Sequence, residues 1–207
     1  MSSKSNLRRL IVAVLFGAGL LPPVASSHIP IPPKEPIEIG RRVVEKTVPD
    51  FKLTDQDGKP FQFNRTRGKL VLVTFIFTTC LDVCPLLTAK FATIQRTLEE
   101  SKFRNYLLLS ITTDPERDTA VALKQYARHF RADFHNWSFL TGSRQDMVKV
   151  WKLFGVNVTK NQSAQVQHTS LTTLVDHQGI RRVDYYGDKW QEKEILKDIE
   201  SLSSVKK

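Results

Sequence analysis

The pattern of hydrophobic and polar positions predicts alternating strands and helices along most of the chain. The run KLVLVTFIF, residues 69–77, is almost entirely apolar and rich in β-branched residues, which is typical of a strand covered on both faces. The segments YLLLSITTD and WSFLTG predict two further buried strands. Each of the three is followed by apolar residues at helical spacing, first from about Pro85, then within DTAVALKQYARHF and SRQDMVKVWKLFG.

Two β-hairpins are expected on either side of this alternation. FKLTDQDGKPFQF alternates around Asp57-Gly58, a pair typical of a tight hairpin turn. SLTTLVD and GIRRVDYYG flank a second turn at residues 176–179, and a last amphipathic helix follows from about Gln191. Residues 156–167 are polar and unpatterned, which predicts a loop. This order predicts an α/β sandwich with a central mixed β-sheet flanked by helices, an N-terminal β-hairpin and a late β-hairpin insertion.

The N-terminal part of the chain differs from the rest in composition. A basic start, a short apolar stretch and small residues make residues 1–27 a secretory signal peptide, with an uncleaved anchor as the alternative. Prolines are concentrated just after it, so residues 28–48 are expected to form a Pro-rich spacer. Residues 49–203 are then the folded domain, and residues 204–207 a basic tail.

The net charge is +10, and removal of the three basic residues of the leader, Lys4, Arg8 and Arg9, leaves +7. The remaining basic residues are scattered and form no stripe interleaved with aromatic residues, which argues against a nucleic-acid partner. The leader predicts an exported protein, most simply in a bacterial periplasm. Contact with the inner membrane is expected only through an uncleaved N-terminal segment.

The two cysteines of the chain, Cys80 and Cys84, lie where a buried strand gives way to a helix. Free N–H groups at a helix N-terminus favour the thiolate form. The pair therefore suits a redox couple or a metal site, and the spacing alone does not separate the two. A structural disulfide is a third possibility, but it closes a very short loop and gains little stability.

Two thiolates leave a soft-metal site short of one ligand, and histidine is the natural third. His168 stands out among the five histidines because it directly precedes a core strand. Two sulfurs and an imidazole suit Cu(I), and with one more oxygen or nitrogen ligand they suit Cu(II). Zinc more commonly recruits four protein ligands. The other histidines are assigned to the spacer, to the end of a helix, to a loop and to a hairpin tip: His28, His129, His135 and His177.

Three aspartates near these positions are expected to be structural. Asp82, between the cysteines, is predicted to be an exposed turn residue. Asp114 and Asp118 flank the sequence PER after a strand and are predicted to be turn and helix-cap residues, with Thr119 as the alternative cap.

Four segments in order, FTTCLDVCP, TTDPERDT, WSFLTG and HTSLTTLVDHQG, resemble successive blocks of the SCO/SenC family of copper-handling proteins, from about Pro49 to Trp190. The resemblance implies a thioredoxin-like fold and one copper ion, Cu(I) or Cu(II), bound by Cys80, Cys84 and His168. The family motif often has His before the first cysteine and Pro after it, where this chain has Thr79 and Leu81.

The resemblance also implies partners. Members of the family deliver copper to the binuclear copper site in subunit II of cytochrome c oxidase, or reduce its cysteines, and other copper chaperones are further expected partners. The leading hypothesis is thus an exported copper metallochaperone. The alternatives are a thiol–disulfide oxidoreductase, in which Cys80 attacks and Cys84 resolves the mixed disulfide, and a redox or copper sensor.

Overall fold

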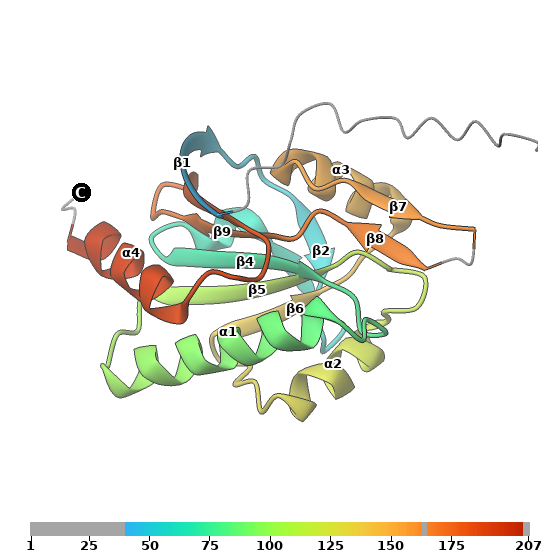
Figure 1. Cartoon of the computed structure of the whole chain (residues 1–207), viewed down its shortest axis with the longest axis horizontal. Helices are drawn as coiled ribbons and strands as arrows, with labels where there is room; N and C mark the ends of the chain where they lie inside the picture. The colour runs from blue at the N-terminus through green and yellow to red at the C-terminus, as the bar shows by residue number, and fades with distance from the viewer. Residues whose placement is uncertain (1–39, 163–164, 205–207) are drawn as a thin grey trace, which may run out of the picture. The chain divides into compact units, whose positions relative to one another are not determined.

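The computed structural model describes residues 40–162 and 165–204 (Figure 1). In chain order its elements are β1 (Gly40–Thr47), β2 (Lys52–Thr54), β3 (Pro60–Gln62), a 3-10 turn (Phe63–Thr66), β4 (Leu70–Ile76), α1 (Val83–Glu100), β5 (Tyr106–Thr112), α2 (Ala120–His129), β6 (Trp137–Leu140), α3 (Arg144–Phe154), β7 (Val158–Lys160), β8 (Val166–His168), β9 (Leu171–Val175), β10 (Ile180–Tyr186) and α4 (Glu192–Ser204).

A central mixed sheet organises the described residues. Its six strands there run in the order β1-β10-β9-β4-β5-β6. The pairs β4–β5 and β5–β6 are parallel, whereas β4–β9, β9–β10 and β10–β1 are antiparallel. The predicted α/β sandwich with a mixed sheet and a late hairpin, β9–β10, is therefore confirmed. The N-terminal hairpin, β2–β3, also forms as predicted.

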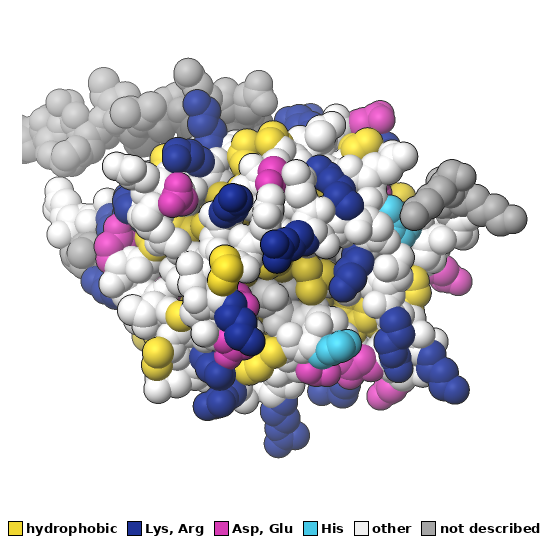
Figure 2. Space-filling model, turned by 180° about the vertical axis from the view of Figure 1, so that it is seen from behind, with side chains coloured by type: hydrophobic (Ala, Val, Ile, Leu, Met, Phe, Trp, Pro, Cys, Tyr) yellow, Lys and Arg dark blue, Asp and Glu magenta, His cyan; other side chains and the backbone are white. Residues whose placement is uncertain are grey.

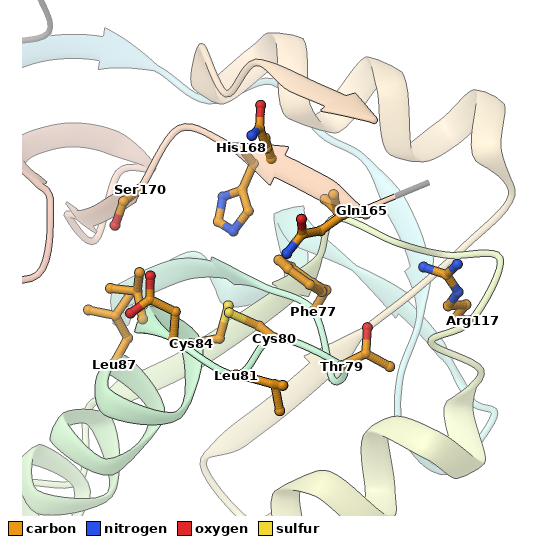
Figure 3. Close-up of a pocket in the computed structure, with 14 residues that line it drawn as sticks. Phe77, Thr79, Cys80, Leu81, Cys84, Leu87, Arg117, Gln165, His168 and Ser170 are labelled. Carbon is orange, nitrogen blue, oxygen red and sulfur yellow. The ribbon is translucent and has the colours of Figure 1, made fainter. Parts of the chain in front are cut away.

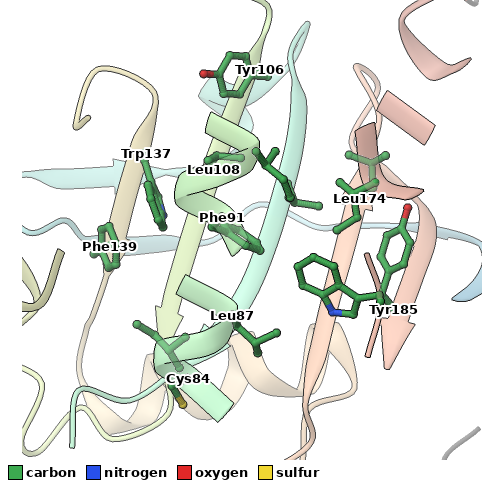
Figure 4. Close-up of a cluster of buried hydrophobic side chains, with 14 of the residues drawn as sticks. Cys84, Leu87, Phe91, Tyr106, Leu108, Trp137, Phe139, Leu174 and Tyr185 are labelled. Atoms are coloured by element: carbon green, nitrogen blue, oxygen red, sulfur yellow. The ribbon is translucent and has the colours of Figure 1, made fainter. Parts of the chain in front are cut away.

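The central strand β4 is buried on both faces because helices or hairpins cover each of them. Leu72 and Ile76 belong to one core, which α1, α2 and α4 complete, whereas Val73 and Phe75 belong to a second core with α3 and the β2–β3 hairpin. Figure 4 shows the first core, in which Phe91 of α1 lies over the sheet. The two cores fix the direction of β4 and the start of α1.

Short polar signals set the ends of the helices. The Thr119 hydroxyl accepts a hydrogen bond from the Ala122 N–H at the start of α2. Ser143 does the same for α3, and Gly155 ends that helix in the left-handed conformation with φ of 73°. Helix α1 begins at Val83, two residues before the predicted start at Pro85.

The predicted boundary of the folded domain at residue 49 is wrong. Residues 40–47, assigned to the spacer, form β1 and pair antiparallel with β10 at the edge of the sheet. Most of their side chains are exposed and several are charged, so the sequence shows no strand pattern here. Backbone hydrogen bonds to β10 hold the strand in place. The predicted signal peptide (1–27), the rest of the spacer (28–39) and most of the predicted tail (205–207) lie outside the described residues. Ser204 is the last residue of α4.

The predicted loop at residues 156–167 is also wrong in part, because β7 and β8 form an antiparallel two-stranded sheet of their own. We call this element the His hairpin, since His168 is the last residue of β8 and pairs with Val158. Three-residue strands are too short to show a period of two in sequence. In Figure 1 the His hairpin extends beside the central sheet rather than within it.

Two surface features complete the description. On the face shown in Figure 2, Lys and Arg side chains are interspersed with acidic and apolar ones, as expected of solvated surface residues. Within the described part of the chain, none of the helices combines the length and the apolar character needed to cross a lipid bilayer.

Candidate metal and thiol site

The segment between β4 and α1 carries both cysteines at the carboxyl end of a central strand, where open α/β sheets form their sites. Cys80 is partly exposed, whereas Cys84 lies in the first turn of α1 and is buried in the core. Both are free thiols. Because β4 and α1 are each packed in the core, the positions of the two sulfurs are set by the main fold.

The two thiols differ in acidity. A hydrogen bond from the Cys84 thiol, reinforced by the backbone N–H groups of Cys84, Asp82 and Val83, lowers the pKa of Cys80 to about 6 despite its partial burial. The same hydrogen bond and burial in the core raise the pKa of Cys84 well above its ordinary value. At neutral pH the site therefore holds an accessible thiolate beside a buried thiol.

His168 extends from the His hairpin toward the cysteines (Figure 3). Its Nδ1 lies 3.0 Å from the Thr169 carbonyl oxygen, and its ring meets the Phe77 ring edge-on with centroids 5.9 Å apart. Burial lowers its pKa, so the ring is neutral at neutral pH. A carbonyl acceptor at Nδ1 favours the tautomer that leaves the Nε2 lone pair available to a metal.

One pocket of about 780 Å³ is lined by all three predicted ligands, Cys80, Cys84 and His168. Figure 3 shows their side chains converging on it from α1, its preceding segment and β8. Across residues 40–162 and 165–204, no three His, Cys, Asp or Glu side chains are already arranged so that they could hold a metal ion. The fold therefore assembles the three side chains around a common cavity without bringing them to coordination distance.

The remaining histidines within the described residues lie away from this pocket. As predicted, His129 ends a helix, α2, and His135 lies in a loop; both are exposed. His177 lies at the β9–β10 turn, where its Nδ1 is 3.1 Å from the Gly68 carbonyl oxygen. His28 lies outside the described residues.

Two aspartates after β5 were predicted to be turn and cap residues. The Asp114 carbonyl accepts a hydrogen bond from the Arg117 N–H, as in a turn, but neither side chain caps α2. Asp114 and Asp118 are fully buried, and Thr119 rather than Asp118 caps α2. Asp118 accepts hydrogen bonds from the Thr78 N–H and from the hydroxyls of Thr78 and Thr112, the hydroxyl bonds both at 2.5 Å. Burial raises the pKa of Asp118, and these hydrogen bonds oppose that change. Asp118 thus anchors the segment that leads to Cys80.

The surface beside the cysteines is apolar and exposed. Leu81 is 97% exposed, and Leu86, one turn into α1, is also exposed. Asp82 is an exposed residue at the N-cap position of α1 whose side chain makes no capping hydrogen bond, which agrees with its predicted turn role. The exposed leucines were visible in the sequence, but nothing there distinguished them from core positions.

Comparison with known proteins identifies the family. The sequence model of SCO1/SenC matches residues 40–204, which include every described strand and helix. The chain belongs to the SCO1/SenC family. This match begins before the predicted start of the resemblance at Pro49 and includes β1.

Members of the SCO1/SenC family are similar to this chain in both sequence and structure. A SCO2-like protein of Rickettsia conorii is 33% identical over 199 residues, 91% of this chain and 94% of its own. The crystal structure of a SCO1/SenC family lipoprotein from Bacillus anthracis is 32% identical with a TM-score of 0.73, over 79% of this chain and 98% of that one.

Two further SCO structures bear on the chemistry of the family. The structure of ScoI from Bradyrhizobium japonicum has copper bound. It is 28% identical with a TM-score of 0.64, over 79% of this chain and 99% of that one. BsSco, a member of the Sco family of cytochrome c oxidase assembly proteins, has a disulfide switch. It is 32% identical with a TM-score of 0.69, over 80% of this chain and 98% of that one. The thioredoxin-like SCO fold is therefore that of this chain.

Proposed function

We propose that this chain is an exported copper metallochaperone that carries one copper ion on Cys80, Cys84 and His168 and assists assembly of the binuclear copper centre of cytochrome c oxidase. The observation that supports this most is the shared pocket, which two thiol sulfurs and a neutral imidazole line together. The copper-bound ScoI structure supports the copper site, and the description of BsSco as a member of the Sco family of cytochrome c oxidase assembly proteins supports the role in assembly.

The protonation states of the three groups favour a soft metal. Cys80 is a thiolate at neutral pH, so copper displaces a proton only from Cys84. The lowered pKa of His168 keeps its ring free of a proton that would compete with the metal. Two sulfurs and one imidazole are ligands that Cu(I) prefers.

Copper is cargo in this proposal and has to leave the site. The Cys80 sulfur is accessible, and the imidazole comes from a separate hairpin. In our proposal the His hairpin approaches the cysteines when copper binds and withdraws when an acceptor protein supplies its own ligands. The binuclear copper site in subunit II of cytochrome c oxidase is the expected acceptor, and another copper chaperone is the expected donor.

Copper affinity provides the test of the ligand assignment. Competition with a chelator measures Cu(I) and Cu(II) binding of the parent, His168→Ala and Cys80→Ser, with His135→Ala as an exposed histidine control. We expect His168→Ala to weaken binding by about 100-fold or more, since even residues that only support a ligand contribute 10–100-fold. Unchanged affinity in His168→Ala would show that the assignment is wrong.

The second candidate is a thiol–disulfide oxidoreductase, and the split acidity of the two thiols favours it. The Cys80 thiolate attacks a target disulfide, and one target sulfur leaves with the electron pair and takes up a proton. Cys84 then loses its proton, attacks the Cys80 sulfur and releases the second target thiol. The target gains two electrons, and the cysteine pair becomes a disulfide.

The same variants separate the two candidates. A metallochaperone loses copper affinity in His168→Ala while its cysteines still reduce a model disulfide. If the parent binds copper no better than Cys80→Ser but reduces the disulfide, the oxidoreductase is the better description. A sensor requires a partner that binds only one state of the pair, which pull-down with the oxidised and the reduced protein measures.

Export is the remaining part of the proposal. It is supported by the layout of residues 1–27 and by the lipoprotein among the bacterial relatives. Mass spectrometry of the protein from a periplasmic fraction gives its N-terminus. A start near residue 28 supports cleavage, an intact N-terminus in the membrane fraction supports the anchor, and recovery in the cytosol contradicts export.

A further inference from the structure

The attachment of the His hairpin differs from that of every strand of the central sheet. β7 and β8 pair only with each other within the described residues, and an isolated two-stranded hairpin is marginally stable in water. The buried side chain of Val166, together with the partly buried Val158, is one attachment to the core. A second is the ion pair between Lys160, the last residue of β7, and the buried carboxylate of Asp114, with Nζ and Oδ1 2.8 Å apart.

The segment that receives Lys160 also holds the cysteine side of the site. We call residues 114–118 the acidic bridge. At one end, the Asp114 carboxylate accepts a hydrogen bond from Lys160 Nζ, and Glu116 Oε2 lies 3.2 Å from the same Nζ. At the other end, Asp118 accepts from the backbone N–H and hydroxyl of Thr78, two residues before Cys80. A single five-residue segment therefore contacts both the element that carries the imidazole and the element that carries the thiols.

We infer that Lys160 is a positioning residue: its ion pair with Asp114 holds the His hairpin against the acidic bridge and so limits how far His168 moves from the cysteine pair. This inference rests on the proposed function, because it assigns a role to Lys160 only if His168 is a ligand. A hairpin held in this way loses less conformational freedom when the metal binds, which lowers the cost of recruiting the third ligand.

The burial of Asp114 makes this ion pair more effective than an ordinary surface pair. The Asp114 side chain has no accessible surface, and its Oδ2 also accepts a hydrogen bond from Arg117 Nη1 at 3.1 Å. An exposed pair such as Lys149–Asp146 within α3 joins residues one turn apart and connects no second element. Lys160–Asp114, in contrast, connects residues 46 positions apart in the chain.

The experiment compares Lys160→Met with Lys160→Arg and with the control Lys149→Met. In the copper-free proteins, the hydrogen-exchange rates of the backbone amides are measured in β7, β8 and the central strand β4. We expect Lys160→Met to speed exchange in the His hairpin about tenfold without changing β4, because the hairpin opens locally. Lys160→Arg keeps a cation within reach of Asp114 and is expected to restore slow exchange.

Copper affinity of the same variants, measured beside His168→Ala, gives the second readout. We expect Lys160→Met to weaken Cu(II) binding about tenfold, Lys160→Arg to recover most of it, and Lys149→Met to match the parent. The visible spectrum of the Cu(II) form is expected to broaden in Lys160→Met because the imidazole occupies several positions.

The two proposals fail in different ways. If His168→Ala binds copper as the parent does, the ligand assignment in the proposed function fails. If His168→Ala is weakened but Lys160→Met keeps parental affinity, or binds more tightly, the role of Lys160 is refuted. Unchanged hairpin exchange in Lys160→Met, or an equal loss in Lys149→Met, also refutes it.

Discussion

The two halves of the candidate site are held by different kinds of interaction. The cysteine half follows β4, which is hydrogen-bonded on both sides within the central sheet, and it continues into α1, which packs on the core. The histidine half is a hairpin outside that sheet, attached through Val166 and Val158 on the core, the His168–Phe77 ring contact and the Lys160–Asp114 ion pair. The sulfurs are therefore fixed by the central sheet and α1, whereas the imidazole is held by side-chain contacts outside that sheet.

This difference suits a protein that has to release what it binds. A rigid thiol pair keeps its acidity and its geometry between cycles, because both depend on the start of α1. If the third ligand is weakly attached, the bond between the metal and His168 breaks at a low free-energy cost before the acceptor's ligands bind the metal. The predictions below disturb one half at a time.

The largest effect is expected from the core beneath the cysteine half. Phe91 is fully buried in α1 and contacts the rings of Trp137 and Trp190. Phe91→Ala is expected to lower the free energy of unfolding by about 3–5 kcal/mol through lost burial and a cavity. Denaturant unfolding measures it, with the exposed Val121→Ala on α2 as a control expected to stay within about 0.5 kcal/mol.

A second prediction concerns the acidity of the thiol pair. The pKa of Cys80 is lowered to about 6, so its reaction with iodoacetamide is expected to proceed fully above that pH and to be lost as the pH falls through it. Cys84→Ala removes the thiol that donates to Cys80 and is expected to raise the pKa of Cys80 toward its ordinary value. Alkylation rates between pH 4 and about 10 measure the change, and an unchanged midpoint would mean that the helix N-terminus alone sets the acidity.

A third prediction concerns the hairpin half. Val166 is buried against the core from β8. Val166→Ala is expected to lower the free energy of unfolding by only about 1.5 kcal/mol, from the loss of two methyl groups at about 0.8 kcal/mol each. Exchange of the hairpin amides is expected to become faster. A loss as large as that of Phe91→Ala would contradict the view that the hairpin is a weakly attached element.

The smallest effect on stability is expected at the surface beside the thiols. Leu81 is almost fully exposed, so Leu81→Ser is expected to change the free energy of unfolding by less than about 0.5 kcal/mol. If Leu81 contacts the acceptor protein, the same variant slows copper transfer without changing copper affinity. Stopped-flow transfer to a copper-accepting domain measures this, and an unchanged rate would exclude Leu81 from the contact.

The sequence predicted the cysteine half well because that half depends on local patterns. A continuous apolar strand, a proline near a helix start and two cysteines at the junction are all visible within residues 69–91. The helix caps at Thr119 and Ser143 are equally local. Such features follow from interactions between near neighbours in the chain.

Features that depend on distant partners were missed. β1 has the composition of a charged linker and becomes a strand only because β10 lies beside it. Asp114 and Asp118 have the sequence context of turn residues, yet both are buried and are bound by Lys160 and Thr78 from two other parts of the chain. His168 was singled out by its place before a core strand and by the family resemblance, but the strand that carries it was not predicted. In each case the missing information is tertiary.

X-ray absorption at copper in the Cu(I)-loaded protein tests most directly whether the hairpin supplies the third ligand. The parent is expected to have two sulfur neighbours and one imidazole nitrogen, and His168→Ala to lose the nitrogen while both sulfurs remain. A parent with two sulfurs alone, or a nitrogen that persists in His168→Ala, would contradict the account.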